Sequence, residues 1–197
     1  MKKSLLFCIM ALFLAACSSA EERFDEIRKQ PNFTSYERVV KQEARANFKC
    51  QGFDSRSETC AMITEFTAWD GQNAEKIAIL GKRDPNLHVT AVYLRHDVES
   101  PDGFNCYTKS VVDLDAFVDL PDNHPEAERI RNRLADRRGA FEEILTISNV
   151  VCEAYFRDGH GYVVKMFTPQ GEENERWPDR TVLLTSRRYD LRVYNES

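Results

Sequence analysis

The sequence lacks the short motifs that mark the common enzyme classes. It contains no G-x-S-x-G nucleophile elbow, no H-E-x-x-H metal motif, no S-x-x-K pair and no glycine-rich phosphate loop. The familiar hydrolase and nucleotide-binding signatures are therefore excluded, and an enzyme is the less favoured interpretation. No C-x-x-C pair occurs either, which argues against a zinc knuckle and a thioredoxin-like redox centre. No motif points to a cofactor.

Long apolar runs and an excess of basic residues are also missing. Beyond residue 16, no stretch approaches the roughly 18 apolar residues of a membrane-spanning helix. The chain has 27 Lys and Arg residues against 32 Asp and Glu residues, a formal net charge of −5. This acidic balance makes the protein a poor candidate for binding nucleic acid.

The first 16 residues show the pattern of a secretion signal. Lys2 and Lys3 supply positive charge, and the apolar stretch 5–16 follows, bordered by small residues. As a helix this stretch reaches only ~18 Å, whereas the hydrocarbon core of a bilayer is about 30 Å thick. The segment therefore predicts export and not a permanent membrane span.

The end of this segment, Leu14-Ala15-Ala16-Cys17, resembles the lipobox of bacterial lipoproteins. The resemblance implies cleavage before Cys17, a diacylglycerol on its sulfur and acylation of the new α-amine. Each buried CH₂ contributes about 0.8 kcal/mol, so two or three acyl chains anchor a protein effectively permanently. In such lipoproteins an aspartate directly after the lipidated cysteine implies retention in the inner membrane. Ser18 occupies this position, so the resemblance implies a lipid-anchored protein of the outer membrane that faces the periplasm. The alternative is an ordinary signal in which Cys17 is incidental.

The expected organisation is therefore a signal peptide at 1–16, a lipid-anchored tether with a short helix at 17–32, and one domain at 33–197. Cleavage removes two of the basic residues and none of the acidic ones, which changes the net charge to −7. The remaining 181 residues are enough for one domain with a sizeable core.

Four cysteines remain for the folded domain: Cys50, Cys60, Cys106 and Cys152. An even number in an oxidising compartment favours disulfides, and three pairings are possible. The polar segment 51–59 has the composition of a loop, which favours Cys50–Cys60 and leaves Cys106–Cys152 to join two strands. A loop of this length contributes about 2–3 kcal/mol in the chain-entropy treatment.

Periodicity and turn residues predict two helices and several strands. One helix is expected to begin at the capping pattern of residues 34–37, and the second is expected to span residues 123–139. The expected strands are 61–69, 75–82, 87–96, 104–112, 149–157, 162–168 and 181–194. We therefore predict an α+β fold, an antiparallel sheet of about six or seven strands with one face covered by two main helices. The order is also compatible with two related α-then-β halves.

Three combinations of residues suggest chemistry, and each has a plainer interpretation. His88 and His96 are eight strand residues apart, roughly 26 Å, which is too far for ligands of one zinc ion. Cys152 lies in a strand and His160 in a turn, so they do not form a nucleophile–base pair. Four acids, Asp113, Asp115, Asp119 and Asp122, suggest calcium. The EF-hand pattern fails there at Phe117 and Val118, so solvated acids beside buried Leu114, Phe117 and Leu120 are favoured over another type of calcium site.

Arginines are concentrated in two segments. Arg129, Arg131, Arg133, Arg137 and Arg138 lie in the second helix, and Arg180, Arg187, Arg188 and Arg192 lie in the last strand. Arg129, Arg133 and Arg137 are four residues apart, so they form one ridge that could bind an anionic partner. The alternative is a solvated face whose charges complement the helix dipole.

Three functions remain open. We expect a non-enzymatic outer-membrane lipoprotein that binds an envelope protein or a cell-wall component. The alternatives are a lipid-anchored hydrolase without a recognisable motif and a carrier of an apolar ligand. An exposed arginine face would favour the first, a cleft holding two carboxylates the second, and a large apolar cavity the third.

Overall fold

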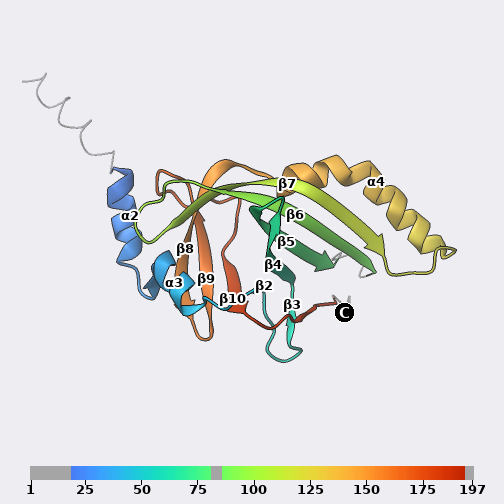
Figure 1. The fold of residues 1–197 in the computed structure, drawn as a ribbon, viewed down its shortest axis with the longest axis horizontal. Helices are drawn as coiled ribbons and strands as arrows, with labels where there is room; N and C mark the ends of the chain where they lie inside the picture. Colours follow the sequence, from blue (N-terminus) through green and yellow to red (C-terminus); the bar gives the residue numbers. More distant parts are fainter. Residues whose placement is uncertain (1–18, 81–85, 194–197) are drawn as a thin grey trace, which may run out of the picture.

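The computed structural model describes residues 19–80 and 86–193, and most of these residues are in β-strands (Figure 1). The described helices are α2 (Ala20–Arg28), α3 (Tyr36–Gln42) and α4 (Pro125–Leu145). The strands are β1 (Phe33–Thr34), β2 (Phe48–Gln51), β3 (Thr59–Cys60), β4 (Met62–Trp69), β5 (Gln72–Leu80), β6 (Leu87–Asp97), β7 (Asn105–Val118), β8 (Ile147–Asp158), β9 (Gly161–Phe167), β10 (Arg180–Thr185) and β11 (Asp190–Leu191). None of these helices combines the length and apolar character needed to cross a membrane.

Eight of the strands close into an antiparallel barrel. From β4 to β10 each strand pairs with the next one in the chain, and β2 pairs with both β4 and β10 to complete the circle. Closure pairs backbone groups that the edges of an open sheet would leave exposed. The short β1 pairs with β8 outside the circle, and β3 and β11 form a separate parallel pair.

The expected α+β arrangement is therefore wrong. Two main helices do not cover one face of an open sheet, because the sheet curls on itself and encloses its own inner face. Figure 1 shows α3 beside β8 and β9, and α4 along the far part of β6 and β7. In the part of the chain that the structure describes, β4 to β10 form one meander into which only the helix α4 is inserted, so the option of two α-then-β halves is also wrong.

Local sequence explains where several elements begin and end. Ser35 caps α3 by accepting a hydrogen bond from the Arg38 backbone N–H. Asp70 and Gly71 both have positive φ angles, 48° and 77°, as a tight two-residue hairpin turn between β4 and β5 requires. At Gly161 a Cβ atom would lie 2.4 Å from the Val182 carbonyl oxygen, so the close approach of β9 to β10 needs glycine.

The expected segments differ from the observed ones mainly in length. β7 continues to Val118 through the acidic stretch, α4 continues beyond Gly139 to Leu145, and the last expected strand is divided into β10 and β11. Along β7, alternation buries Leu114 inside the barrel and places Phe117 outside, where it is 52% exposed. The expectation that Phe117 is buried is therefore wrong.

The apolar core fills the barrel on the α4 side. Leu87, Val89, Ala91 and Leu114 point inward from β6 and β7, and Ile130 of α4 packs against them. Helix α2 packs elsewhere, where Phe24 contacts Phe104 with ring centroids 4.6 Å apart. Residues 20–28 of the expected tether thus form a helix that is packed on the barrel.

Both expected disulfides are confirmed. Cys50–Cys60 joins β2 to β3 across a sequence separation of 10 residues, and Cys106–Cys152 joins directly opposite residues of β7 and β8 across 46 residues. All four cysteines are buried. Cys17 of the lipobox-like segment lies outside the described residues.

Candidate functional site

Charged side chains point into the barrel at the end where α3 lies. They are Lys49 of β2, Glu75 of β5, Arg95 of β6, Lys109 of β7 and Glu153 of β8. The strand register places these side chains on the inner face. Tyr93, which is buried, lies opposite Glu75, and Arg95 lies opposite Lys109. Tyr93 and Arg95 are two residues apart on β6 and therefore share a face of the sheet. Each of the five side chains is at most 11% exposed. We call this set the interior charge cluster.

Glu75 is held between two cations. Lys109 Nζ donates a hydrogen bond of 2.5 Å to Glu75 Oε2, and Arg95 Nη1 donates one of 3.3 Å to Oε1. Burial by itself would raise the pKa of Glu75, but the charges of Lys109, Lys49 and Arg95 outweigh it and hold this pKa far below its ordinary value. Glu75 is therefore a fixed anion.

Glu153 is held mainly by tyrosine hydroxyls. Tyr107 donates a hydrogen bond of 2.8 Å to Oε1 and Tyr155 one of 2.7 Å to Oε2. Lys49 Nζ lies 4.0 Å from Oε1, at the outer limit of an ion pair. Burial opposes ionisation, yet Lys49, the other two cations and the Tyr155 hydroxyl lower the pKa of Glu153 to about 2. For the two tyrosines, burial and the Glu153 charge raise the pKa well above the ordinary value.

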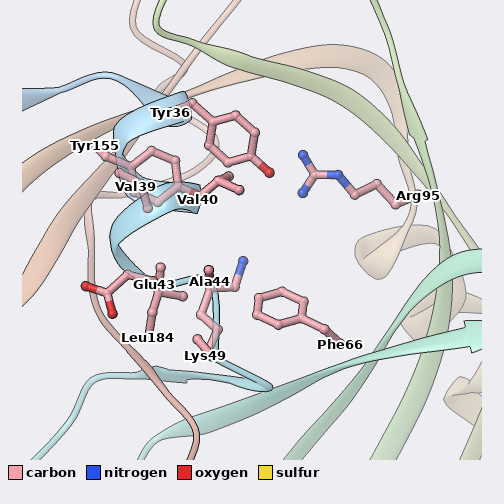
Figure 2. Close-up of a pocket in the computed structure, with 11 residues that line it drawn as sticks. Tyr36, Val39, Val40, Glu43, Ala44, Lys49, Phe66, Arg95, Tyr155 and Leu184 are labelled. Atoms are coloured by element: carbon pink, nitrogen blue, oxygen red, sulfur yellow. The ribbon is translucent and has the colours of Figure 1, made fainter.

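A pocket opens directly above this cluster. Its volume is about 310 Å³, and it lies between α3 and the barrel mouth. The lining residues are Tyr36, Val39, Val40, Glu43, Ala44, Ala46, Lys49, Phe66, Arg95, Tyr155 and Leu184. Figure 2 shows the Tyr36 hydroxyl, the Arg95 guanidinium and the Lys49 ammonium directed into the same space, with the Phe66 ring beside them. The pocket therefore has apolar walls and a cationic floor.

Arg95 is incompletely satisfied at this floor. Its Nε donates to Asp97 Oδ1 at 2.6 Å, its Nη1 reaches Glu75, and its guanidinium lies over the Tyr107 ring at 3.9 Å from the centroid. Its Nη2 is buried and has no hydrogen-bond partner among the described residues. A buried donor without an acceptor is unfavourable by about 1–3 kcal/mol, so a ligand oxygen at this position would stabilise the site.

Glu43, the only carboxylate among the described residues that line the pocket, is turned to other partners. Glu43 accepts a hydrogen bond of 3.2 Å from the Tyr162 hydroxyl and forms an ion pair of 3.6 Å with Arg157. Figure 2 shows its carboxylate directed away from the pocket centre. The described lining residues include no serine, cysteine or histidine. They therefore suit binding, and they do not form a Ser–His or Cys–His pair.

This site was not predicted from the sequence, although the sequence contains a signal for it. Charged residues in a strand normally mark its solvent face, so Lys109 and Glu153 gave no indication of a buried site. Each of them, however, is two positions from a tyrosine, Tyr107 or Tyr155, and shares its face of the strand. A charged residue two positions from an aromatic residue in the same strand is the pattern that could have revealed the cluster.

The expected arginine ridge lies elsewhere, on α4. The Arg129 and Arg133 side chains are exposed, as expected, and Arg129 forms an ion pair with Glu126 one turn away. The side chain of Arg137 lies outside the described residues. In the C-terminal group, Arg187 Nη2 pairs with Glu58 at 3.0 Å, and Arg192 donates a hydrogen bond of 2.6 Å to the Gly52 carbonyl oxygen.

The histidine and aspartate combinations do not form a metal centre in the described part of the chain, where no group of three or more suitable side chains occurs. His88 instead stacks on Phe117, with ring centroids 4.4 Å apart. Asp113 and Asp115 are exposed on β7. Cys152 is bonded to Cys106 and is not available as a nucleophile.

Comparison with known proteins gives no relative: no family model, no curated protein and no solved structure matches this chain.

Proposed function

We propose that the protein is a carrier that holds a small ligand with an apolar body in the pocket between α3 and the barrel mouth. The observation that carries this proposal is the pocket itself, a space of about 310 Å³ walled by Val39, Val40, Phe66 and Leu184 above a buried polar floor. Eight-stranded barrels have interiors that either fill with side chains or hold one small ligand. Small-molecule pockets begin at roughly 300 Å³ and combine apolar walls with few polar groups.

The geometry gives less support to a hydrolase. Two carboxylates do lie below the pocket, but Glu75 and Glu153 are fixed by cations and tyrosines and have lowered pKa values. A general acid must hold a proton near neutral pH. Neither residue meets that requirement.

We further propose that the carrier is a lipoprotein of the outer membrane. The support is the lipobox-like sequence that ends at Cys17, followed by Ser18. Ser19 caps α2, and it accepts a hydrogen bond from the Glu22 backbone N–H. A lipid on Cys17 would thus be one residue from the packed domain, and the barrel would be held close to the bilayer.

Titration calorimetry with n-alkanols from butanol to decanol tests the carrier function. Each added CH₂ contributes about 0.8 kcal/mol when it is buried, so affinity should rise about four-fold per carbon until the pocket is full. Beyond that length the affinity should level off. Absence of binding for every member of the series would refute the proposal.

A pocket-filling variant locates the binding. Ala44 lines the pocket, and Ala44→Trp should occupy it and abolish alkanol binding. The matched control is Ala140→Trp, at an exposed position of α4, which should bind like the parent. Equal loss in both variants would place the binding elsewhere.

A further inference from the structure

We infer that the ligand of this pocket is a monocarboxylate, whose carboxylate group is bound by Arg95 and Lys49. The inference rests on the proposed carrier function and specifies the chemical class of the ligand. Figure 2 shows both cationic groups at the pocket floor, directed toward the space between α3 and Phe66.

Charge pairing in the interior charge cluster favours an anionic ligand. Its cations are Lys49, Arg95 and Lys109, and its anions are Glu75 and Glu153. Asp97, whose side chain is 56% exposed, pairs with Arg95 at 2.6 Å. Lys49 is thus the buried cation of the cluster that lacks a close counterion, because its nearest carboxylate oxygen is 4.0 Å away. Burying a charge without a counterion is unfavourable, and one negative charge from a ligand would neutralise it.

Hydrogen bonding also favours a carboxylate at the pocket floor. Arg95 Nη2 is buried without an acceptor among the described residues, and Lys49 Nζ is 4.0 Å from its nearest carboxylate oxygen, beyond hydrogen-bond distance. A carboxylate has two acceptor oxygens, one for each of these donors. Hydrogen bonds between ionised partners are roughly twice as strong as neutral ones.

Competing anions differ from a carboxylate in charge. A phosphate monoester carries about 1.5 to 2 negative charges at neutral pH and would overcompensate the single positive charge of Lys49. The walls of Val39, Val40 and Leu184 favour an apolar body. A short- to medium-chain carboxylate fits both conditions.

Calorimetry with octanoate, n-octanol and octyl phosphate at pH 7 tests the inference. We expect octanoate to bind at least about ten-fold more tightly than octanol, because it makes the two charge-assisted hydrogen bonds. Octyl phosphate should bind more weakly than octanoate. Equal binding of octanol and octanoate would overturn the carboxylate assignment and leave the carrier function intact, whereas failure of all three would overturn both. Tighter binding of octyl phosphate would overturn the monoanion argument.

Variants identify the donor. Lys49→Met keeps the length of the side chain and removes the charge, so the ratio of octanoate affinity to octanol affinity should fall about ten-fold. Lys41→Met, at an exposed position of α3 outside the pocket lining, is the matched control for long-range charge effects and should retain octanoate binding. An unchanged ratio in Lys49→Met would contradict the inference.

Discussion

Lys109 and Glu75 form an ion pair inside the barrel, with Nζ 2.5 Å from Oε2 and side chains only 8% and 4% exposed. Because both side chains are buried, solvent cannot readily replace either partner. The pair also holds Glu75 in position to receive the Arg95 guanidinium, which forms the pocket floor. The stability of the barrel and the geometry of the pocket are therefore linked through these two residues.

Lys109→Met should destabilise the protein strongly. Removal of one partner from a buried ion pair typically lowers the free energy of unfolding by about 3–5 kcal/mol, because the other charge stays buried without compensation. Arg95 still contacts Glu75, so we expect the lower part of this range. The measurement is urea denaturation followed by circular dichroism.

The matched control for that substitution is Arg187→Met. Arg187 pairs with Glu58 at 3.0 Å, but the two side chains are 61% and 58% exposed. Exposed ion pairs contribute about 0–1 kcal/mol, so this variant should unfold close to the parent. Similar losses in both variants would show that burial of the Lys109 pair is energetically unimportant.

The interior carboxylates should make the protein sensitive to acid. The pKa of Glu153 is lowered from 4.5 to about 2 in the folded protein. A lowered pKa means that the folded state binds the proton less readily than the unfolded state. The stabilisation is fully present above about pH 4.5 and is lost as the pH falls through about 2. Unfolding measured from pH 6 to pH 2 should show this decline.

The variant Glu153→Gln separates this residue from the other acids. It should be less stable than the parent at pH 6, and its stability should decline less steeply between pH 4.5 and pH 2, because it cannot gain a proton. Glu37→Gln, at an exposed position of α3, should follow the parent curve. Parallel curves for Glu153→Gln and the parent would exclude Glu153 as a source of the acid sensitivity.

Local features of the fold could be predicted from the sequence, but the closure of the sheet could not. Turn residues separated the expected strands, and the loop composition of segment 51–59 favoured the disulfide pairing that is observed. Alternation of apolar and polar residues shows that a strand has one buried face, but it does not show what covers that face. Helices were therefore assigned to cover it, whereas the pairing of β10 with β2 covers it by closing the barrel. That pairing joins segments more than 100 residues apart and leaves no local pattern.

The candidate site was hidden for a related reason. Lys49 and Glu75 are polar residues in strands, and the usual pattern places such residues in solvent. Their burial is favourable only because residues distant in the sequence bring opposite charges to the same level of the barrel. The arginines of α4 stood out in the sequence because they are adjacent, and the structure places them on a helix surface away from the pocket.

Loss of the Cys106–Cys152 disulfide should destabilise the protein more than loss of Cys50–Cys60. The sequence separations are 46 and 10 residues, and the chain-entropy treatment gives about 4 and about 3 kcal/mol, respectively. Double alanine variants of each pair, compared by thermal unfolding, test this order. The opposite order would mean that native packing around each bond outweighs loop entropy.

Cys17→Ala should leave the protein without lipid, because the thioether to diacylglycerol needs the cysteine sulfur. Metabolic labelling with a radioactive fatty acid should mark the parent and not the variant. Cys8→Ala, within the apolar stretch of the signal, is the control and should keep the label. Label that persists in Cys17→Ala would refute the lipoprotein proposal.

The arginine ridge of α4 should be nearly neutral for stability. Arg129 and Arg133 are exposed, and the ion pair of Arg129 with Glu126 is one of the exposed, same-helix type. Surface substitutions of this kind usually change the free energy of unfolding within about 0.5 kcal/mol each. The triple replacement of Arg129, Arg133 and Arg137 by glutamine should therefore lower the melting temperature by less than about 5 °C.

The same triple variant also decides whether this ridge binds a partner. If α4 presents a solvated face only, crosslinking in the cell envelope should capture the same proteins from the variant as from the parent, and octanoate binding in the distant pocket should be unchanged. If the ridge binds an anionic partner, one captured protein should be missing from the variant, and its capture by the parent should weaken with added salt, because exposed charges are screened beyond about 8–10 Å at physiological ionic strength. We expect the first result, since Arg129 already pairs with Glu126, whereas the buried Lys49 at the pocket floor is 4.0 Å from its nearest carboxylate oxygen.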